Sequence, residues 1–108
     1  MAKGLKENQI LVVIKEPGKE PYVEPRFDNT LEAFQHAVGG YIETVTFCSD
    51  VCFICNEEGR LKGHPYNFSA LGCDFVGTVL AVGIKDDEFA SLKSSFVPHI
   101  MQMMRCRE

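Results

Sequence analysis

ILVVI, at residues 10–14, is an apolar and mostly β-branched run that ends at the turn residues EPG, 16–18. Such a run between turn formers is typical of a buried β-strand. Residues 22–27 follow and look extended, but Pro21 and Pro25 lack the N–H groups that a central strand needs. The sequence therefore predicts a buried first strand with an edge strand beside it.

A short amphipathic helix follows. Leu31, Phe34 and Val38 recur at i, i+3 and i+7, which places them on one apolar face. Asn29 and Glu32 have the spacing of a capping box, and two glycines directly after Val38 can end the helix. This pattern predicts a helix that begins near residue 30, with Phe34 at the centre of its buried face.

The remaining elements are read from apolar runs and turn formers. The C-terminal helix falls within residues 94–105, with Ser95 as its cap and Pro98 in its first turn. Before it we expect strands at 41–47 and 51–56, a short return strand at 60–62, an irregular segment at 63–72, a strand at 76–82, and a short turn or helix from residue 86.

This order of elements predicts one α+β domain that covers residues 1–108, with residues 1–8 flexible. We expect a mixed or antiparallel sheet of about four to five strands with the helices packed on one face. A β-grasp-like arrangement is one way to connect such elements.

Composition excludes several classes of protein. The net charge is −4, and no run of Lys or Arg supplies the basic patch that a nucleic-acid binder needs. No segment has the apolar length of a signal peptide or a membrane span. The five cysteines are an odd number, which together with the missing signal indicates reduced thiols in a cytoplasmic protein.

The cysteines raise the question of a metal site. Cys48, Cys52 and Cys55 have the spacing of a radical S-adenosylmethionine iron–sulfur motif, and Cys52 and Cys55 with His64 and Cys73 could supply four zinc ligands. However, Cys52 and Cys55 lie three apart on an expected strand, so their side chains should point to opposite faces. We therefore expect no metal and no cofactor, and read these thiols as small buried hydrophobes.

Catalysis by a thiol is the enzyme alternative. Cys48 lies in an expected loop, and His36, His64 and His99 are possible bases. No spacing links any of these pairs, so the sequence predicts no catalytic residues.

Two groups of residues are candidates for contact with a ligand or a partner. The first is a loop that carries an imidazole, an amide and two aromatic rings, which could instead cover the edge of the core. The second is a set of methionines in the C-terminal helix, which could contact a partner or a second copy, or pack on the sheet. The candidate residues are His64, Tyr66, Asn67 and Phe68 in the loop, and Met101, Met103 and Met104 in the helix.

Several strings resemble a family of small proteins of unknown function found in bacterial genomes, phages and mobile elements. They are VVIKEPGK at 12–19, PYV at 21–23, NTLE at 29–32, VGGYIE at 38–43, NEEGRLKG at 56–63 and VG at 82–83. The likeness runs from about Ile10 to about Leu92 and implies a mobile-element setting, but it brings no site residues. The chain departs from the family at Tyr66, Asn67 and Phe68, where such proteins often have an Asn-Arg pair.

The sequence favours a non-enzymatic binding protein of a phage or mobile element, such as an antagonist of a host defence like a CRISPR nuclease. Its partner is expected to be a protein, with a homodimer or a small ligand also open, and with no direct contact to nucleic acid or membrane. The alternatives are a sponge for a small ligand or nucleotide at His64 to Phe68, and an enzyme that uses Cys48.

Overall fold

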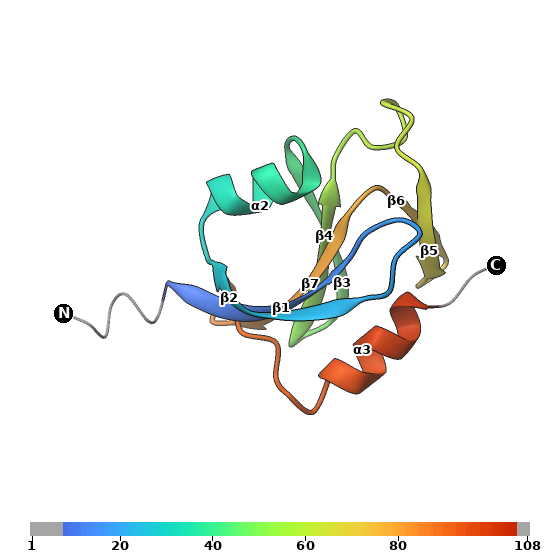
Figure 1. The fold of residues 1–108 in the computed structure, drawn as a ribbon. Coiled ribbons are helices and arrows are strands. Elements are labelled where there is room, and N and C mark those ends of the chain that lie inside the picture. Colours follow the sequence, from blue (N-terminus) through green and yellow to red (C-terminus); the bar gives the residue numbers. More distant parts are fainter. Residues whose placement is uncertain (1–7, 106–108) are drawn as a thin grey trace.

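Strand β1 (Gln9–Lys15) contains the ILVVI run and lies inside an antiparallel sheet. It pairs with β2 (Tyr22–Asp28) on one side and with β7 (Val79–Lys85) on the other. In this computed structural model, which describes residues 8–105, β2 therefore lies beside β1 at the edge of the sheet, as the sequence predicted (Figure 1).

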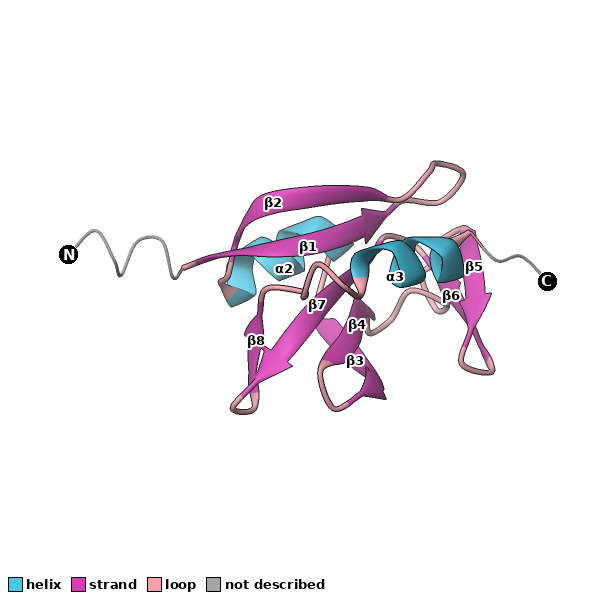
Figure 2. Ribbon diagram, turned by 90° about the horizontal axis from the view of Figure 1, so that it is seen from below, coloured by secondary structure: helices cyan, strands magenta, loops and turns pink. Residues whose placement is uncertain are grey.

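The main sheet has six strands in the order β2-β1-β7-β4-β3, with β8 paired to β7, and a separate hairpin is formed by β5 and β6. β2 and β3 are the two ends of this strand order, and Figure 2 shows β8 beside β7. The other elements are α2 (Leu31–Val38), β3 (Ile42–Cys48), β4 (Val51–Asn56), β5 (Tyr66–Ala70), β6 (Cys73–Val76), β8 (Glu88–Ala90) and α3 (Val97–Met104).

The α+β class and the antiparallel alternative are confirmed, because every strand pair in the sheet is antiparallel. The central pair β1 and β7 is antiparallel as well, whereas the β-grasp arrangement has a parallel pair at this place. The main sheet has six strands instead of the four or five that the sequence predicted, because β8 was not foreseen, and the separate β5–β6 hairpin was not foreseen either.

The prediction that both helices cover one face of the sheet is wrong. On β4, Phe53 and Cys55 belong to the core cluster that includes Ile100 of α3, whereas Cys52 and Ile54 belong to the cluster under α2. Figure 1 shows α2 and α3 on opposite sides of the sheet. Because the central strands are apolar on both faces, each face of the sheet must be shielded from solvent by a helix of its own.

Helix α2 is anchored as predicted at Phe34, which is 1% exposed. Its ring packs against Phe27 and Phe89, with centroid separations of 5.0 and 5.1 Å. The cap lies one residue later than expected: Thr30 Oγ1 accepts a hydrogen bond from the Ala33 N–H, while the side chain of Asn29 donates to the carbonyl of Phe89. The first glycine, Gly39, ends the helix with a φ of 80°, a left-handed conformation that glycine adopts without strain.

The segment between β4 and β7 differs most from expectation. Residues 60–62 form a turn rather than a return strand, and the segment 63–72, predicted to be irregular, contains β5. Residue 76 ends β6, so the predicted strand at 76–82 begins only at Val79 as β7, and the turn at Asp86 and Asp87 leads into β8 instead of a helix. In both places the chain forms a β-hairpin, β5–β6 in the first and β7–β8 in the second, where the turn-forming residues had indicated an irregular segment and a short turn or helix.

Helix α3 forms in the predicted segment but is shorter. It begins after Phe96, which makes no side-chain cap hydrogen bond, so Ser95 is not the cap, and Pro98 lies in the first turn as expected. Its Ile100 and Met104 are completely buried on the sheet. No helix within residues 8–105 is long and apolar enough to cross a membrane. The expectation for residues 1–8 falls, apart from Asn8, outside the described residues.

Candidate functional site

The outer edge of β3 is the most distinctive open feature of the sheet. Its pairing with β4 is regular from Ile42 opposite Asn56 to Thr46 opposite Cys52, and within residues 8–105 no strand pairs with its other side. The Glu57 N–H donates to the Tyr41 carbonyl across this ladder. Because hydrogen bonding alternates along an antiparallel strand, the N–H and C=O groups of three residues point outward. These are Ile42, Thr44 and Thr46.

Most of this edge lacks the features that usually block strand addition, since the register of β3 against β4 shifts only between Thr46 and Cys48, at the end of the strand. The opposite edge strand, β2, carries Pro25 between two charged residues and has a register shift against β1. β3 contains no proline and no lysine, and Glu43 is its single charge. The outer side of the regular part of β3, from Ile42 to Thr46, is therefore a free template for one more strand.

A groove of about 430 Å³ borders this edge on the α3 side of the sheet. Its apolar lining comes from Val45 of β3, from Phe75 and Val76 of β6, and from Leu61 in the turn after β4. Leu61 is 87% exposed and Tyr41, next to β3, is 69% exposed, the two highest values among the large hydrophobic residues described. Such exposed apolar side chains beside a groove are typical of an interaction site.

The rim of the groove is acidic. Four carboxylates and a single guanidinium line it: Glu43, Glu57, Glu58, Asp74 and Arg60. Glu58 lies 3.8 Å from Lys62, and Asp74 accepts a hydrogen bond from the Ser69 hydroxyl at 2.7 Å. Within the described residues no ion pair or hydrogen bond engages the carboxylates of Glu43 and Glu57. These two charges are available to a partner.

The wall of the groove is held by Asn56, which is 6% exposed. Its amide donates to the carbonyl of Val38 at 3.0 Å, and its side-chain oxygen accepts from the N–H of Glu58 at 2.7 Å. Arg60 donates to the backbone carbonyl of Asp74 on β6. The turn after β4 is thus tied to α2 and to the hairpin, so the groove is a formed feature of the fold.

Cys55 and Cys73 also line the groove, whereas Cys52 lies on the other face of β4. Burial raises the pKa of Cys52 to about 11, and burial with the nearby carboxylate of Glu43 raises that of Cys55 to about 11. The predicted divergence of Cys52 and Cys55 is confirmed. Within residues 8–105 no three His, Cys, Asp or Glu side chains converge in the way that a metal site requires.

The predicted binding loop is divided between the core and the surface. Phe68 is fully buried and stacks on Phe75 at 4.8 Å, and Asn67 is 1% exposed. Tyr66 remains exposed, with its hydroxyl 2.7 Å from that of Ser69. His64 is half-buried beside Gly77. The structure thus uses Asn67 and Phe68 for packing and leaves Tyr66 accessible.

The candidate methionines pack on the sheet of their own chain. Met104 is completely buried, and Met101 and Met103 are partly buried against the same core cluster. This arrangement favours the alternative in which α3 covers the sheet.

Cys48, the candidate nucleophile, lies at the end of β3 rather than in a loop, and packs partly buried against the core. His36 is on α2, across the sheet from that core, while the ring of His99 lies 6.1 Å from that of Phe47. None of the hydrogen bonds found among the described residues joins Cys48 to a histidine.

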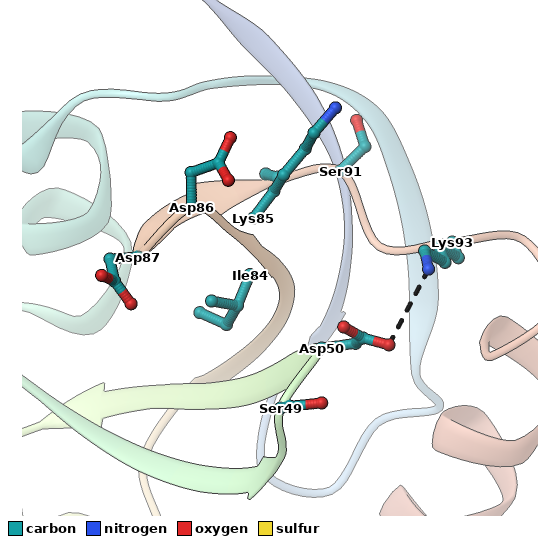
Figure 3. Close-up of a pocket in the computed structure, with 9 residues that line it drawn as sticks. Ser49, Asp50, Ile84, Lys85, Asp86, Asp87, Ser91 and Lys93 are labelled. Carbon is teal, nitrogen blue, oxygen red and sulfur yellow. Dashed lines mark ion pairs between the residues drawn. The ribbon is translucent and has the colours of Figure 1, made fainter.

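A second hollow, shown in Figure 3, lies between the β3–β4 and β7–β8 turns and has a volume of about 510 Å³. Three of its polar side chains make contacts: Asp50 pairs with Lys93 at 3.8 Å, and the Ser91 hydroxyl accepts from the Leu11 N–H at 2.9 Å. Asp86 and Asp87 form the hairpin turn with positive φ angles. This hollow is a solvated charged surface without converging groups.

Comparison with known proteins places the chain in a family. Residues 10–105 match the family model described as Domain of unknown function (DUF3846). The chain belongs to this family. No curated protein and no solved structure matches it. The DUF3846 match therefore extends the likeness seen in the sequence through α3, but carries no activity with it.

Sequence reasoning did not find the β3 groove. Residues 56–59 were interpreted as a turn and residues 60–62 as a short return strand, and Glu57, Glu58 and Leu61 were the available signal. That β3 is an outer strand depends on the order β2-β1-β7-β4-β3, which pattern reading along the chain does not provide.

Proposed function

We propose that this DUF3846 protein is a non-enzymatic binding module that recognises an extended segment of another protein at the β3 edge. The observation that carries the proposal is the open edge of β3, regular from Ile42 to Thr46, beside a formed groove. Strand addition at a free edge supplies affinity through backbone hydrogen bonds, and a neighbouring groove supplies selectivity through alternate side chains.

The cellular setting that we propose is a phage or mobile element, and the target is a protein of a host defence system such as a CRISPR nuclease. This part of the proposal rests on the resemblance of the chain to a family met in such elements. A cytoplasmic location fits the free thiols of the described cysteines, since disulfides are rare in reducing compartments.

Affinity capture with matched variants tests the proposal. Thr44→Pro removes an outward N–H from the middle of β3 without removing a bond to β4, whereas Thr44→Val keeps that N–H and a β-branched side chain. The tagged wild type and both variants are used for capture from infected or conjugating cells. Mass spectrometry should find a protein that wild type and Thr44→Val retain and Thr44→Pro loses.

Equal melting temperatures of the three proteins show that the variants are folded. Retention of the same partner by Thr44→Pro would place binding elsewhere and overturn the proposal. Recovery of a small molecule instead of a protein would favour the sponge. A catalytic role for Cys48 would be indicated by an unusually fast reaction of that thiol with an alkylating reagent, because a catalytic thiolate has a depressed pKa.

A further inference from the structure

We infer that the segment recognised at the β3 edge is basic: an extended stretch in which lysine or arginine alternates with small apolar residues. This inference rests on the proposed function and names the chemistry of the partner. Two features of the groove beside this edge support it: the charge of the rim and the apolar floor.

Charge complementarity indicates that the partner segment is positively charged. The groove presents four carboxylates against one guanidinium, and the carboxylates of Glu43 and Glu57 have no partner among the described residues. The whole chain is also acidic, with a net charge of −4. An acidic segment would be repelled here, whereas a basic segment would be steered toward the groove and held in place.

The apolar floor of the groove lies on the same face of the sheet as its acidic rim. An added strand places every second side chain on the α3 side of the sheet, about 7 Å apart along the strand. There they meet Val45, Phe75 and Val76, with Leu61 at the end of the groove. Because Glu43 lies on the same face as Val45, the basic side chains of the partner are the ones that take this side: their aliphatic stems can cover the floor while their charged ends reach the rim. The small apolar side chains between them then lie on the α2 side of the sheet. The alternation of the partner thus follows from the pleat of β3.

A second copy of this chain is the competing occupant. β3 could pair with its own copy about Thr44, but both copies would then bring their acidic grooves and a net charge of −4 each into contact. β3 itself carries Glu43 and no basic residue to offset that charge. The charge distribution therefore favours a foreign basic segment over a homodimer.

Fluorescence anisotropy with synthetic peptides tests this inference. Three labelled peptides of about nine residues are compared: alternating lysine and valine, the same peptide with glutamate in place of lysine, and the lysine peptide with alternate backbone nitrogens methylated. The lysine peptide should bind with a Kd of about 100 µM or tighter, and the other two at least about tenfold more weakly. Its affinity should fall as salt is added.

Protein variants locate the interaction. Thr44→Pro should weaken the lysine peptide about tenfold or more, and Thr44→Val should leave it unchanged. Glu43→Gln together with Glu57→Gln should weaken it about threefold to tenfold and flatten the salt dependence. Gln102→Glu on the exposed side of α3 is the matched surface control and should have no effect.

The outcomes separate this inference from the proposed function. Equal binding of the lysine and glutamate peptides, with both sensitive to Thr44→Pro, would overturn the basic preference and keep strand addition. If neither N-methylation of the peptide nor Thr44→Pro weakens binding of the lysine peptide, the binding is ionic adsorption, and both this inference and strand addition at β3 are overturned. Absence of binding at about 1 mM, or a dimer in sedimentation that Thr44→Pro dissociates, would overturn the basic segment as occupant.

Discussion

Lys15 and Asn67 exchange two hydrogen bonds in the interior of the protein, and each residue donates one of them. The Lys15 ammonium donates to Asn67 Oδ1 at 2.9 Å, and Asn67 Nδ2 donates to the Lys15 carbonyl at 2.8 Å and to that of Gly77 at 2.7 Å. Both residues are nearly inaccessible, with exposures of 5% and 1%. This exchange joins β1 to the β5–β6 hairpin, so it positions the hairpin that forms one wall of the groove.

Asn67→Ala should therefore destabilise the fold by about 3 kcal/mol or more. It leaves the carbonyls of Lys15 and Gly77 buried without this donor and takes one acceptor from the ammonium. Denaturant unfolding measures the change. Tyr66→Phe, which removes an exposed contact with Ser69, is the control and should cost less than about 1 kcal/mol. Similar costs for the two changes would contradict this role for Asn67.

Phe34→Ala should cost about 3–5 kcal/mol, because the ring is 1% exposed and packs between Phe27 and Phe89. Gln35→Ala changes the neighbouring, partly exposed position and should alter the free energy of unfolding by less than about 0.5 kcal/mol. Thermal or denaturant unfolding of both variants gives the comparison. Equal losses would mean that α2 does not pack on the sheet through this face.

Much of the fold could be predicted because local patterns and burial agree. The ILVVI run became β1, residues 51–56 became β4, and the apolar spacing around Phe34 became the buried face of α2. Strand β5 was missed because Pro65, Asn67 and Gly72 are turn formers. Asn67 lies in a strand because its side-chain amide forms hydrogen bonds with Lys15, which is 52 residues away in the sequence.

The opposite placement of the two helices had a signal in the sequence. Residues 51–55, VCFIC, are apolar at every position, which indicates a strand that is buried on both faces. The groove had no comparable signal. It depends on β3 being an outer strand and on β6 packing against the sheet, and both are contacts between distant segments.

The burial of Met104 changes what is expected of the C-terminal helix. Met104→Glu would place a carboxylate in a site with no exposure, next to the core cluster, and should unfold the domain or cost more than about 3 kcal/mol. Gln102→Glu, on the exposed side of the same helix, should cost less than about 0.5 kcal/mol. Circular dichroism melting curves distinguish the two variants. A folded Met104→Glu protein that lost only self-association would show that α3 is an interface.

The thiols of Cys52 and Cys55 should not bind metal, since they extend from opposite faces of β4 into two separate clusters. Protein purified without chelator should contain no stoichiometric zinc or iron by elemental analysis. One metal ion per chain, with unfolding when a chelator removes it, would contradict this expectation.

The same two thiols should make the protein less stable at alkaline pH. Burial raises the pKa of each from 9.0 to about 11 in the folded protein. Between these values the unfolded chain releases the thiol protons while the folded chain retains them, so the free energy of unfolding falls as pH rises. Each thiol should contribute a decrease of about 1 kcal/mol per pH unit over this window.

Denaturant unfolding at pH 7.5 and pH 10 measures this loss in the wild type, in Cys52→Ala and in Cys55→Ala. Each variant should lose less stability between the two pH values than the wild type, although its stability at pH 7.5 is lower because a buried side chain has been truncated. Other groups that titrate in this range, including Tyr22 with its raised pKa, are shared by all three proteins and cancel in the difference. Identical losses in all three proteins would show that the buried thiols do not govern the alkaline transition.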